Sequence, residues 1–248
     1  MTNADRYHFA DFTRANYRRL LRLASVRYVF RRMTDFRRDE AFVIWRHDLD
    51  FSVHAALRLA RIEAEEGVRA TYLIDIHSEF YNPFEREVSD CIRSIAALGH
   101  EMGIHFDTHY YGIEKEDEIE QPLSRERQFC EELFECPFPV FSFHISTPFT
   151  QACRQMRYGA LINANAEYFQ SEVAYCSDSN GFWRFRRLED VLTSAEDPRL
   201  QVLTHPEWWQ DEVLSPRQRI ERCINGRAEG TRRRYEETLR RTGRLNIE

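Results

Sequence analysis

Two short segments of this chain carry side chains that together could hold a metal ion. The first spans residues 46–50 (RHDLD) and the second spans residues 103–109 (GIHFDTH). The first ends a hydrophobic run that is typical of a buried strand. Side chains two apart on a strand share a face, so Asp48 and Asp50 should point the same way, with Arg46 behind them.

The second segment contributes two histidines, His105 and His109, four residues apart. On a straight strand they would lie ~13 Å apart, too far to share one ion. If the chain turns or begins a helix after Phe106, they fall on one face. One carboxylate and two imidazoles leave a tetrahedral zinc with an open position, which is the pattern of a catalytic site. The two segments therefore indicate a metal-dependent hydrolase.

Strands and helices alternate along most of the chain and would position these groups. We expect strands at residues 41–49, 70–76, 101–106, 140–144, 161–164 and 200–204. We expect helices at residues 11–25, 53–66, 87–98 and 123–134, and a charged C-terminal helix that opens at Ser215-Pro216. This alternation predicts a parallel sheet covered by helices, either open or closed into a barrel.

The groups that could do chemistry follow the expected strands in a regular way. Each lies at or just beyond the C-terminal end of a strand: Asp48 and Asp50, His105 and His109, His144, and His205. Barrels and doubly wound sheets keep their active sites at this end. Four separate strand ends therefore supply metal- or proton-competent groups to one edge of the sheet.

Composition limits the partners of the chain. Its 248 residues are 42% hydrophobic and 13% aromatic, enough for a sizeable core. The 35 basic and 41 acidic residues give a net charge of −6, and acids interrupt the arginine-rich stretches, so we expect no nucleic-acid partner. No stretch approaches the ~18 apolar residues of a membrane helix.

The six cysteines form no CxxC pair, so we expect reduced thiols, with a disulfide between Cys130 and Cys136 as the alternative. Residues 1–12 lack the apolar core of a signal peptide. We expect a cytoplasmic protein whose oligomeric state the sequence leaves open.

With these residues the chain resembles the polysaccharide deacetylase superfamily, carbohydrate esterase family 4. The resemblance covers residues 43–209 and is strongest at residues 99–109 (GHEMGIHFDTH), which are similar to the family pattern GHE-x-G-x-H-x-x-x-H. The segment RHDLD resembles a divergent branch associated with surface-polysaccharide and O-antigen biosynthesis. The resemblance implies a distorted (β/α)7-type barrel, similar to a TIM barrel. We expect one domain, with residues 1–40 as a helical segment packed on a barrel of residues 41–248.

The resemblance also implies roles for individual residues. Asp50, His105 and His109 would hold one divalent metal ion, with zinc as the first choice. Asp48 would be the general base, and His205, in a late L-x-H motif, would be the general acid that protonates the leaving amine.

The chain departs from the family pattern in two places. Leu49 separates two aspartates that are adjacent in the family, which leaves open which of them binds metal. Residues 143–148 (FHISTP) stand where the family has R-x-P-Y, so His144 becomes a second acid–base or substrate-binding candidate. Further candidates for substrate binding are Arg46, Asp178 in the segment 177–180, and Trp208 among the aromatic residues Tyr110, Tyr111, Trp183 and Trp209.

Three functions fit these residues. The first is removal of an N-acyl group, acetyl or formyl, from an amino sugar, as a nucleotide- or lipid-linked precursor of lipopolysaccharide O-antigen or capsule. The second is hydrolysis of a non-sugar amide. The third is a catalytically silent domain that binds a glycan or a partner protein.

Overall fold

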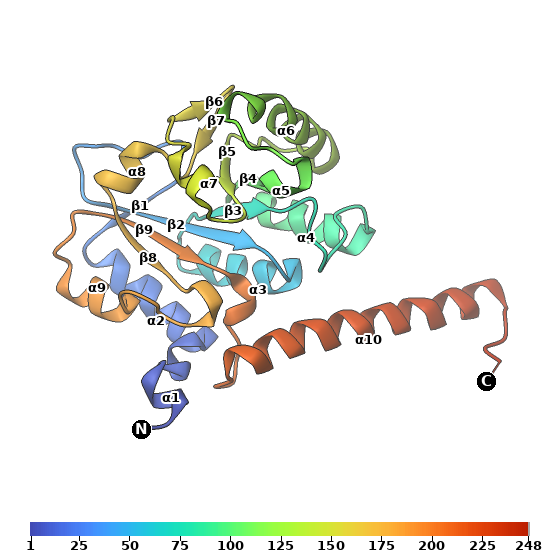
Figure 1. The fold of residues 1–248 in the computed structure, drawn as a ribbon. Helices are drawn as coiled ribbons and strands as arrows, with labels where there is room; N and C mark the ends of the chain where they lie inside the picture. The colour runs from blue at the N-terminus through green and yellow to red at the C-terminus, as the bar shows by residue number, and fades with distance from the viewer. Residues whose placement is uncertain (248) are drawn as a thin grey trace.

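A curved, mostly parallel sheet runs through the computed structural model, which describes residues 1–247. Its strands are β1 (Val29–Arg31), β2 (Phe42–Leu49), β3 (Thr71–Ile74), β4 (Glu101–Phe106), β5 (Val140–Phe143), β6 (Arg157–Tyr158), β7 (Leu161–Asn163), β8 (Ala174–Ser177) and β9 (Arg199–Thr204). The order is β6-β7-β5-β4-β3-β2-β9-β8, with β1 also paired to β2, and β6 alone among the described strands is antiparallel to its neighbour. Within the described residues β6 and β8 do not pair with each other, so the barrel is incomplete (Figure 1).

Strand β2 lies in the middle of the sheet, and all eight of its residues are buried. Strand β9 pairs with one edge of β2. On the other edge, β1 pairs with the first residues of β2 and β3 pairs with the last ones. A strand covered on both faces needs a continuous apolar run, which Phe42–Trp45 supplies. The polar residues of β2 come only towards its C-terminal end.

Helices connect the strands and cover the outer face of the sheet (Figure 1). They are α1 (Asn3–Arg6), α2 (Arg14–Ser25), α3 (Val53–Glu65), α4 (Arg86–Ala97), α5 (Thr108–Tyr111), α6 (Glu120–Phe134), α7 (Pro148–Ala152), α8 (Glu167–Ser171), α9 (Leu188–Ser194) and α10 (Pro216–Thr242). Short 3-10 turns occur at η1 (Phe9–Phe12), η2 (Glu116–Glu118), η3 (Ser179–Gly181) and η4 (Pro206–Trp208). The side chains of Ser52 and Ser215 cap the N-terminal ends of α3 and α10.

The architecture confirms the predicted α/β fold, a single domain built on an incomplete (β/α) barrel with helices at both ends of the chain. The six predicted strands are all present, β4 with the predicted bounds. Residues 1–40 contribute more than the helices expected of them, because β1 extends the sheet beside β2. Among the described residues, no helix is both long and apolar enough to cross a membrane.

A buried polar network joins the sheet to the helices on its outer face. Glu63 of α3 lies at its centre and accepts hydrogen bonds from the hydroxyl groups of Tyr17 and Tyr72. His47 Nε2 lies 2.6 Å from Glu63 Oε1, and its Nδ1 lies 2.7 Å from Thr204 Oγ1. The network ties α2 and α3 to β2, β3 and β9. It therefore fixes the strands whose ends carry the candidate site.

One buried side chain anchors the start of the C-terminal helix α10 to the barrel. Arg219 is fully buried and donates to the carbonyl oxygens of Gly181 (3.0 Å) and Phe9 (3.1 Å). Its guanidinium also lies 4.5 Å from the ring centroid of Phe12. Beyond this anchor α10 passes the N-terminal end of α4, where Arg227 and Arg234 pair with Glu85, and only its last part projects away from the barrel (Figure 1).

Candidate metal and acid–base site

Three side chains at the C-terminal ends of three strands form a cluster with the chemistry of a metal site. Asp50 follows β2, His105 lies in β4, and His144 follows β5. One donor atom from each lies within 4.8 Å of the other two. His105 Nε2 is 3.3 Å and His144 Nδ1 is 3.7 Å from Asp50 Oδ1. Parallel strands bring their C-terminal ends to one edge, which explains why residues so far apart in sequence meet here.

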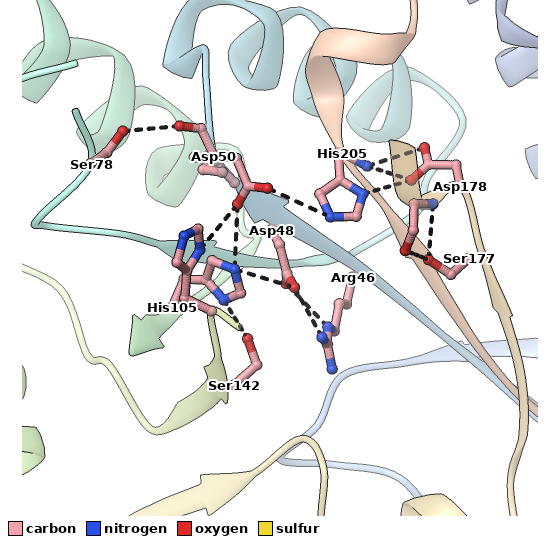
Figure 2. Close-up of polar contacts among 12 residues, drawn as sticks. Arg46, Asp48, Asp50, Ser78, His105, Ser142, Ser177, Asp178 and His205 are labelled. Atoms are coloured by element: carbon pink, nitrogen blue, oxygen red, sulfur yellow. Dashed lines mark hydrogen bonds and ion pairs between the residues drawn. The ribbon is translucent and has the colours of Figure 1, made fainter. Parts of the chain in front are cut away.

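The hydrogen bonding of this cluster fits a divalent metal. Asp50 Oδ1 and His144 Nδ1 are buried and have no hydrogen-bond partner among the described residues. Buried polar atoms in proteins nearly always have a hydrogen-bond partner. Two neighbouring buried atoms without one therefore indicate that a bound group, such as a metal ion, belongs between them. His105 Nδ1 lies 2.7 Å from Ser142 Oγ, which leaves Nε2 directed at Asp50 (Figure 2). Such support of the second ring nitrogen is usual for a histidine that binds metal.

His109 is not part of this cluster, contrary to the expectation from the sequence. The chain does begin a helix after Phe106, but α5 is a single turn capped by Asp107. In this turn the His109 side chain is 56% exposed, and its Nδ1 lies 3.6 Å from Asp107 Oδ1. The structure brings His144, and not His109, next to Asp50 and His105.

Asp48 lies beside the cluster and is paired with Arg46 on the same face of β2. The Arg46 Nε and Nη2 groups donate to the two Asp48 oxygens at 3.1 and 3.0 Å. Burial alone would raise the pKa of Asp48, but the charges of Arg46 and His105 hold that pKa below its usual value. Asp48 is therefore an ionised, oriented proton acceptor, 3.7 Å from His105 Nε2.

His205 faces the cluster from β9 and is held by Asp178, which follows β8 (Figure 2). His205 Nδ1 lies 2.7 Å from Asp178 Oδ1, and its Nε2 lies 3.9 Å from Asp50 Oδ2. Burial would lower the pKa of His205, but the hydrogen bond and charge of Asp178 raise it to about 10. At neutral pH the imidazole is therefore a proton donor directed at the site.

Asp178 has a different role from the predicted one of binding substrate. Its side chain is fully buried, and the backbone N–H of His205 donates to both of its oxygens. The indole of Trp209 donates to Oδ2 at 3.0 Å. With both oxygens used inside the protein, Asp178 positions His205 and has no surface to offer a ligand.

Trp208 also differs from its predicted role. It is 8% exposed and packs against Gly181, where an added Cβ atom would lie 2.8 Å from the indole. Trp183 and Trp209 pack together with Phe12 in the core. The tryptophans of this region therefore stabilise the fold around His205.

A cavity of about 420 Å³ opens beside these groups. Polar residues on its wall include Arg46, Asp48, His144, Asn165, Gln201 and His205. Within the described residues, Arg46 Nη1, Asn165 Oδ1 and Gln201 Oε1 are buried without a hydrogen-bond partner. These atoms could accept and donate hydrogen bonds to a hydroxylated ligand.

The residues Ser142, Asn165 and Gln201 were not predicted from the sequence as part of the site. Strand alternation could have indicated two of them. Ser142 lies two residues before His144, and Gln201 lies four residues before His205, so each shares a face with a candidate residue. Asn165 lies in a connection and carries no such signal.

Comparisons with solved structures find carbohydrate esterases of family 4. A family 4 carbohydrate esterase from Bacillus anthracis is 11% identical, with a TM-score of 0.47, over 85% of this chain and 86% of that one. A chitin deacetylase from Colletotrichum lindemuthianum is 13% identical, with a TM-score of 0.42, over 77% and 84%. A family 4 pseudoenzyme from Bacillus anthracis is 14% identical, with a TM-score of 0.44, over 78% and 63%.

Neither a model of a known protein family nor a curated protein sequence matches this chain.

Proposed function

We propose that this protein is a metal-dependent deacylase that removes an N-acetyl or N-formyl group from an amino sugar. The observation that carries the proposal is the arrangement around Asp50. A cluster that could hold a metal ion, with two buried polar atoms that lack hydrogen-bond partners, lies between an ionised carboxylate, Asp48, and a protonated imidazole, His205. The resemblance to family 4 carbohydrate esterases favours a sugar amide over other amides. The segment RHDLD resembles the branch associated with surface-polysaccharide biosynthesis. This likeness favours a nucleotide- or lipid-linked precursor of lipopolysaccharide or capsule as the substrate.

The residues of the site have separate roles in amide hydrolysis. Asp50, His105 and His144 would hold one divalent metal, with zinc as the first choice. When bound, such an ion polarises a carbonyl and lowers the pKa of water. Asp48 takes the proton of the water whose oxygen attacks the amide carbon, and Arg46 keeps its carboxylate in position. His205 gives its proton to the nitrogen as the C–N bond breaks, so that a free amine and a carboxylic acid leave.

The pKa shifts of Asp48 and His205 agree with their roles as base and acid. General catalysis needs a base that is ionised and an acid that is protonated at the same pH. The pKa of Asp48 is lowered and that of His205 is raised, so both groups are in the required state over a wide range around neutrality. A site that separates two pKa values in this way assigns the acid and the base.

Metal content tests the site directly. Purified protein should contain about one divalent metal per chain after zinc addition, measured by elemental analysis. His144→Ala should lose this metal because it removes a ligand. His109→Ala is the matched control and should keep it, since that side chain is exposed. Loss of metal in His109→Ala but not in His144→Ala would reverse the assignment, and a wild-type protein without metal would exclude the deacylase.

Asp48→Asn tests the base. The amide cannot take a proton, so turnover of N-acetylated or N-formylated sugar precursors should fall by roughly 10²–10⁴-fold. Release of new amino groups measures the rate. Metal content should remain near one equivalent, because Asp48 is paired with Arg46 outside the three-residue cluster. Loss of metal from this variant would show instead that Asp48 is a ligand.

A further inference from the structure

A second cavity, of about 490 Å³, lies outside the candidate site between α3 and α10. We call it the arginine groove, after the residues Arg58, Arg61, Arg222, Arg227, Arg233 and Arg234 on its wall. Glu87 is the one carboxylate on the wall within the described residues. A wall this rich in guanidinium groups attracts anions.

Helical spacing explains why the groove exists. His54, Arg58 and Arg61 follow one another at four and three residues on α3, so they share one face. Gly226 and Gly230 share the face of α10 that lines the groove. A Cβ atom added to either glycine would meet nothing within 4 Å. Glycine is unfavourable inside a helix, and here it leaves open a space that side chains would otherwise narrow.

Half of these arginines have no carboxylate partner. Arg227 and Arg234 pair with Glu85, Arg234 also pairs with Glu87, and Arg222 pairs with Glu212. These ion pairs hold part of the wall in place. By contrast, Arg58, Arg61 and Arg233 are exposed on the groove wall and make no ion pair within residues 1–247.

The groove begins next to the candidate site. Phe51 and Ser52 directly follow Asp50 in the chain and line the groove. The ring of Phe51 lies 3.9 Å from that of Phe80, measured between centroids, and Phe80 also belongs to the wall. Ser52 is two residues from Asp50, so their Cα atoms are at most about 7 Å apart. One extended molecule could therefore reach both places.

We propose that the arginine groove binds a phosphate or diphosphate group carried by the substrate whose acylamino end lies at Asp50. This inference rests on the proposed deacylase function. Phosphate oxygens match the forked donors of arginine and carry more charge than one carboxylate. Three unpaired guanidinium groups around one space therefore favour a multiply charged anion. A nucleoside diphosphate and a lipid diphosphate share this chemistry.

Titration calorimetry with inorganic pyrophosphate tests the groove without relying on turnover. Wild-type protein should bind pyrophosphate, and the double variant Arg58→Ala/Arg61→Ala should bind roughly a hundredfold more weakly, about tenfold for each charged hydrogen bond lost. Arg217→Ala is the matched control on α10, because its side chain is 87% exposed, pairs with Glu221 and lies outside the groove. His105→Ala should also bind normally. No binding to wild type, or equal binding to the double variant, overturns the proposal.

Two further probes identify the source of the phosphate. Uridine diphosphate should bind if the substrate is nucleotide-linked, and phosphatidylcholine vesicles that contain a polyprenyl diphosphate should bind if it is lipid-linked. In either case the double variant should lose the interaction. Binding of neither probe to the wild type overturns the proposal.

Kinetics separates this inference from the proposed function. The double variant should raise KM for a phosphate-bearing acylamino sugar and leave KM for the free N-acetyl sugar unchanged. If both values stay unchanged in an active enzyme, the groove proposal fails while the deacylase stands. If the protein binds pyrophosphate in the groove but hydrolyses no sugar amide, the deacylase fails, and with it the claim that the anion belongs to its substrate.

Discussion

The pair formed by His205 and Asp178 shows how one buried carboxylate sets the chemistry of a neighbouring residue. Asp178 accepts from both the ring and the backbone of His205 and from the indole of Trp209. These contacts fix the orientation of the imidazole as well as its charge. The ring presents Nε2 to the cluster because Nδ1 is bonded to Asp178.

Asp178→Asn should therefore change the pH dependence of turnover. In the wild type the pKa of His205 is about 10, so the proton donor is lost only in strongly basic solution. Without the negative charge of Asp178, the pKa of His205 should fall, because burial is then opposed mainly by the charges of Asp50 and Glu207. The basic limb of the kcat/KM profile should therefore move to lower pH, with metal content unchanged. An unmoved basic limb would contradict a role for His205 as the acid.

At the same scale, the sequence predicted Asp48, Asp50, His105 and His205 at one edge of the sheet, because strand ends can be located from apolar runs. It did not predict that His144, and not His109, would lie beside Asp50 and His105. The direction of the His109 side chain depends on how Asp107 caps the one-turn helix α5. A periodic sequence pattern does not predict such a local feature. Burial of Asp178 and Trp208 likewise depends on how separate segments pack, which residue type alone does not specify.

At the scale of elements, the close approach of β3, β4 and β5 depends on Gly103. A Cβ atom at this position would lie 2.4 Å from Leu73 Cδ2 and 2.6 Å from the carbonyl oxygen of Val140. The second contact is with backbone, which cannot rotate away. Glycine is required here because the strands that carry His105 and His144 lie too close for any side chain.

Gly103→Ala should consequently affect both stability and metal binding. Overpacking of a core typically costs about 1–3 kcal/mol, and a backbone contact places this site towards the upper end. Urea denaturation should show the lower free energy of unfolding. Displacement of β4 relative to β5 should also weaken metal binding, measured by competition with a chelator. A variant with the stability and metal affinity of the wild type would contradict this account of the glycine.

The elements themselves were predictable where long apolar or amphipathic runs are bounded by turn residues. Strands β2 and β4 and the start of α10 are examples. The strands β1, β6 and β8 were not predicted, since each has at most four residues and includes exposed or half-buried side chains. Such short strands form because a neighbouring strand offers hydrogen bonds, which is information from outside their own sequence.

For the whole molecule, the network around Glu63 is the main buried polar connection between helices and sheet. Burial would raise the pKa of Glu63, but the charge of His47 holds it below its usual value. Its contribution to stability is therefore complete above about pH 4.5, the ordinary value for the unfolded chain, and is lost as the pH falls through the lowered pKa.

Glu63→Ala should lower the free energy of unfolding by roughly 3–5 kcal/mol at pH 7, because it leaves His47 and two tyrosine hydroxyls without their partner. Urea denaturation provides the measurement. Glu65→Ala is the matched control two residues away. Glu65 is 61% exposed and pairs with Arg18 at the surface, so its loss should cost no more than about 1 kcal/mol. Equal effects of the two substitutions would show that the network adds little.

The pairing of β2 with β9 has a consequence for how this chain is made. Phe42 pairs with Arg199. The edge of β2 that binds β9 therefore stays uncovered during synthesis until residues 199–204 have been made. An apolar strand with an open edge is a template for pairing with other chains. Nascent chains, and fragments that end before residue 199, should therefore depend on chaperones to stay free of aggregates. The same strand pairing that assembles the site thus makes its biosynthesis vulnerable until β9 has emerged from the ribosome.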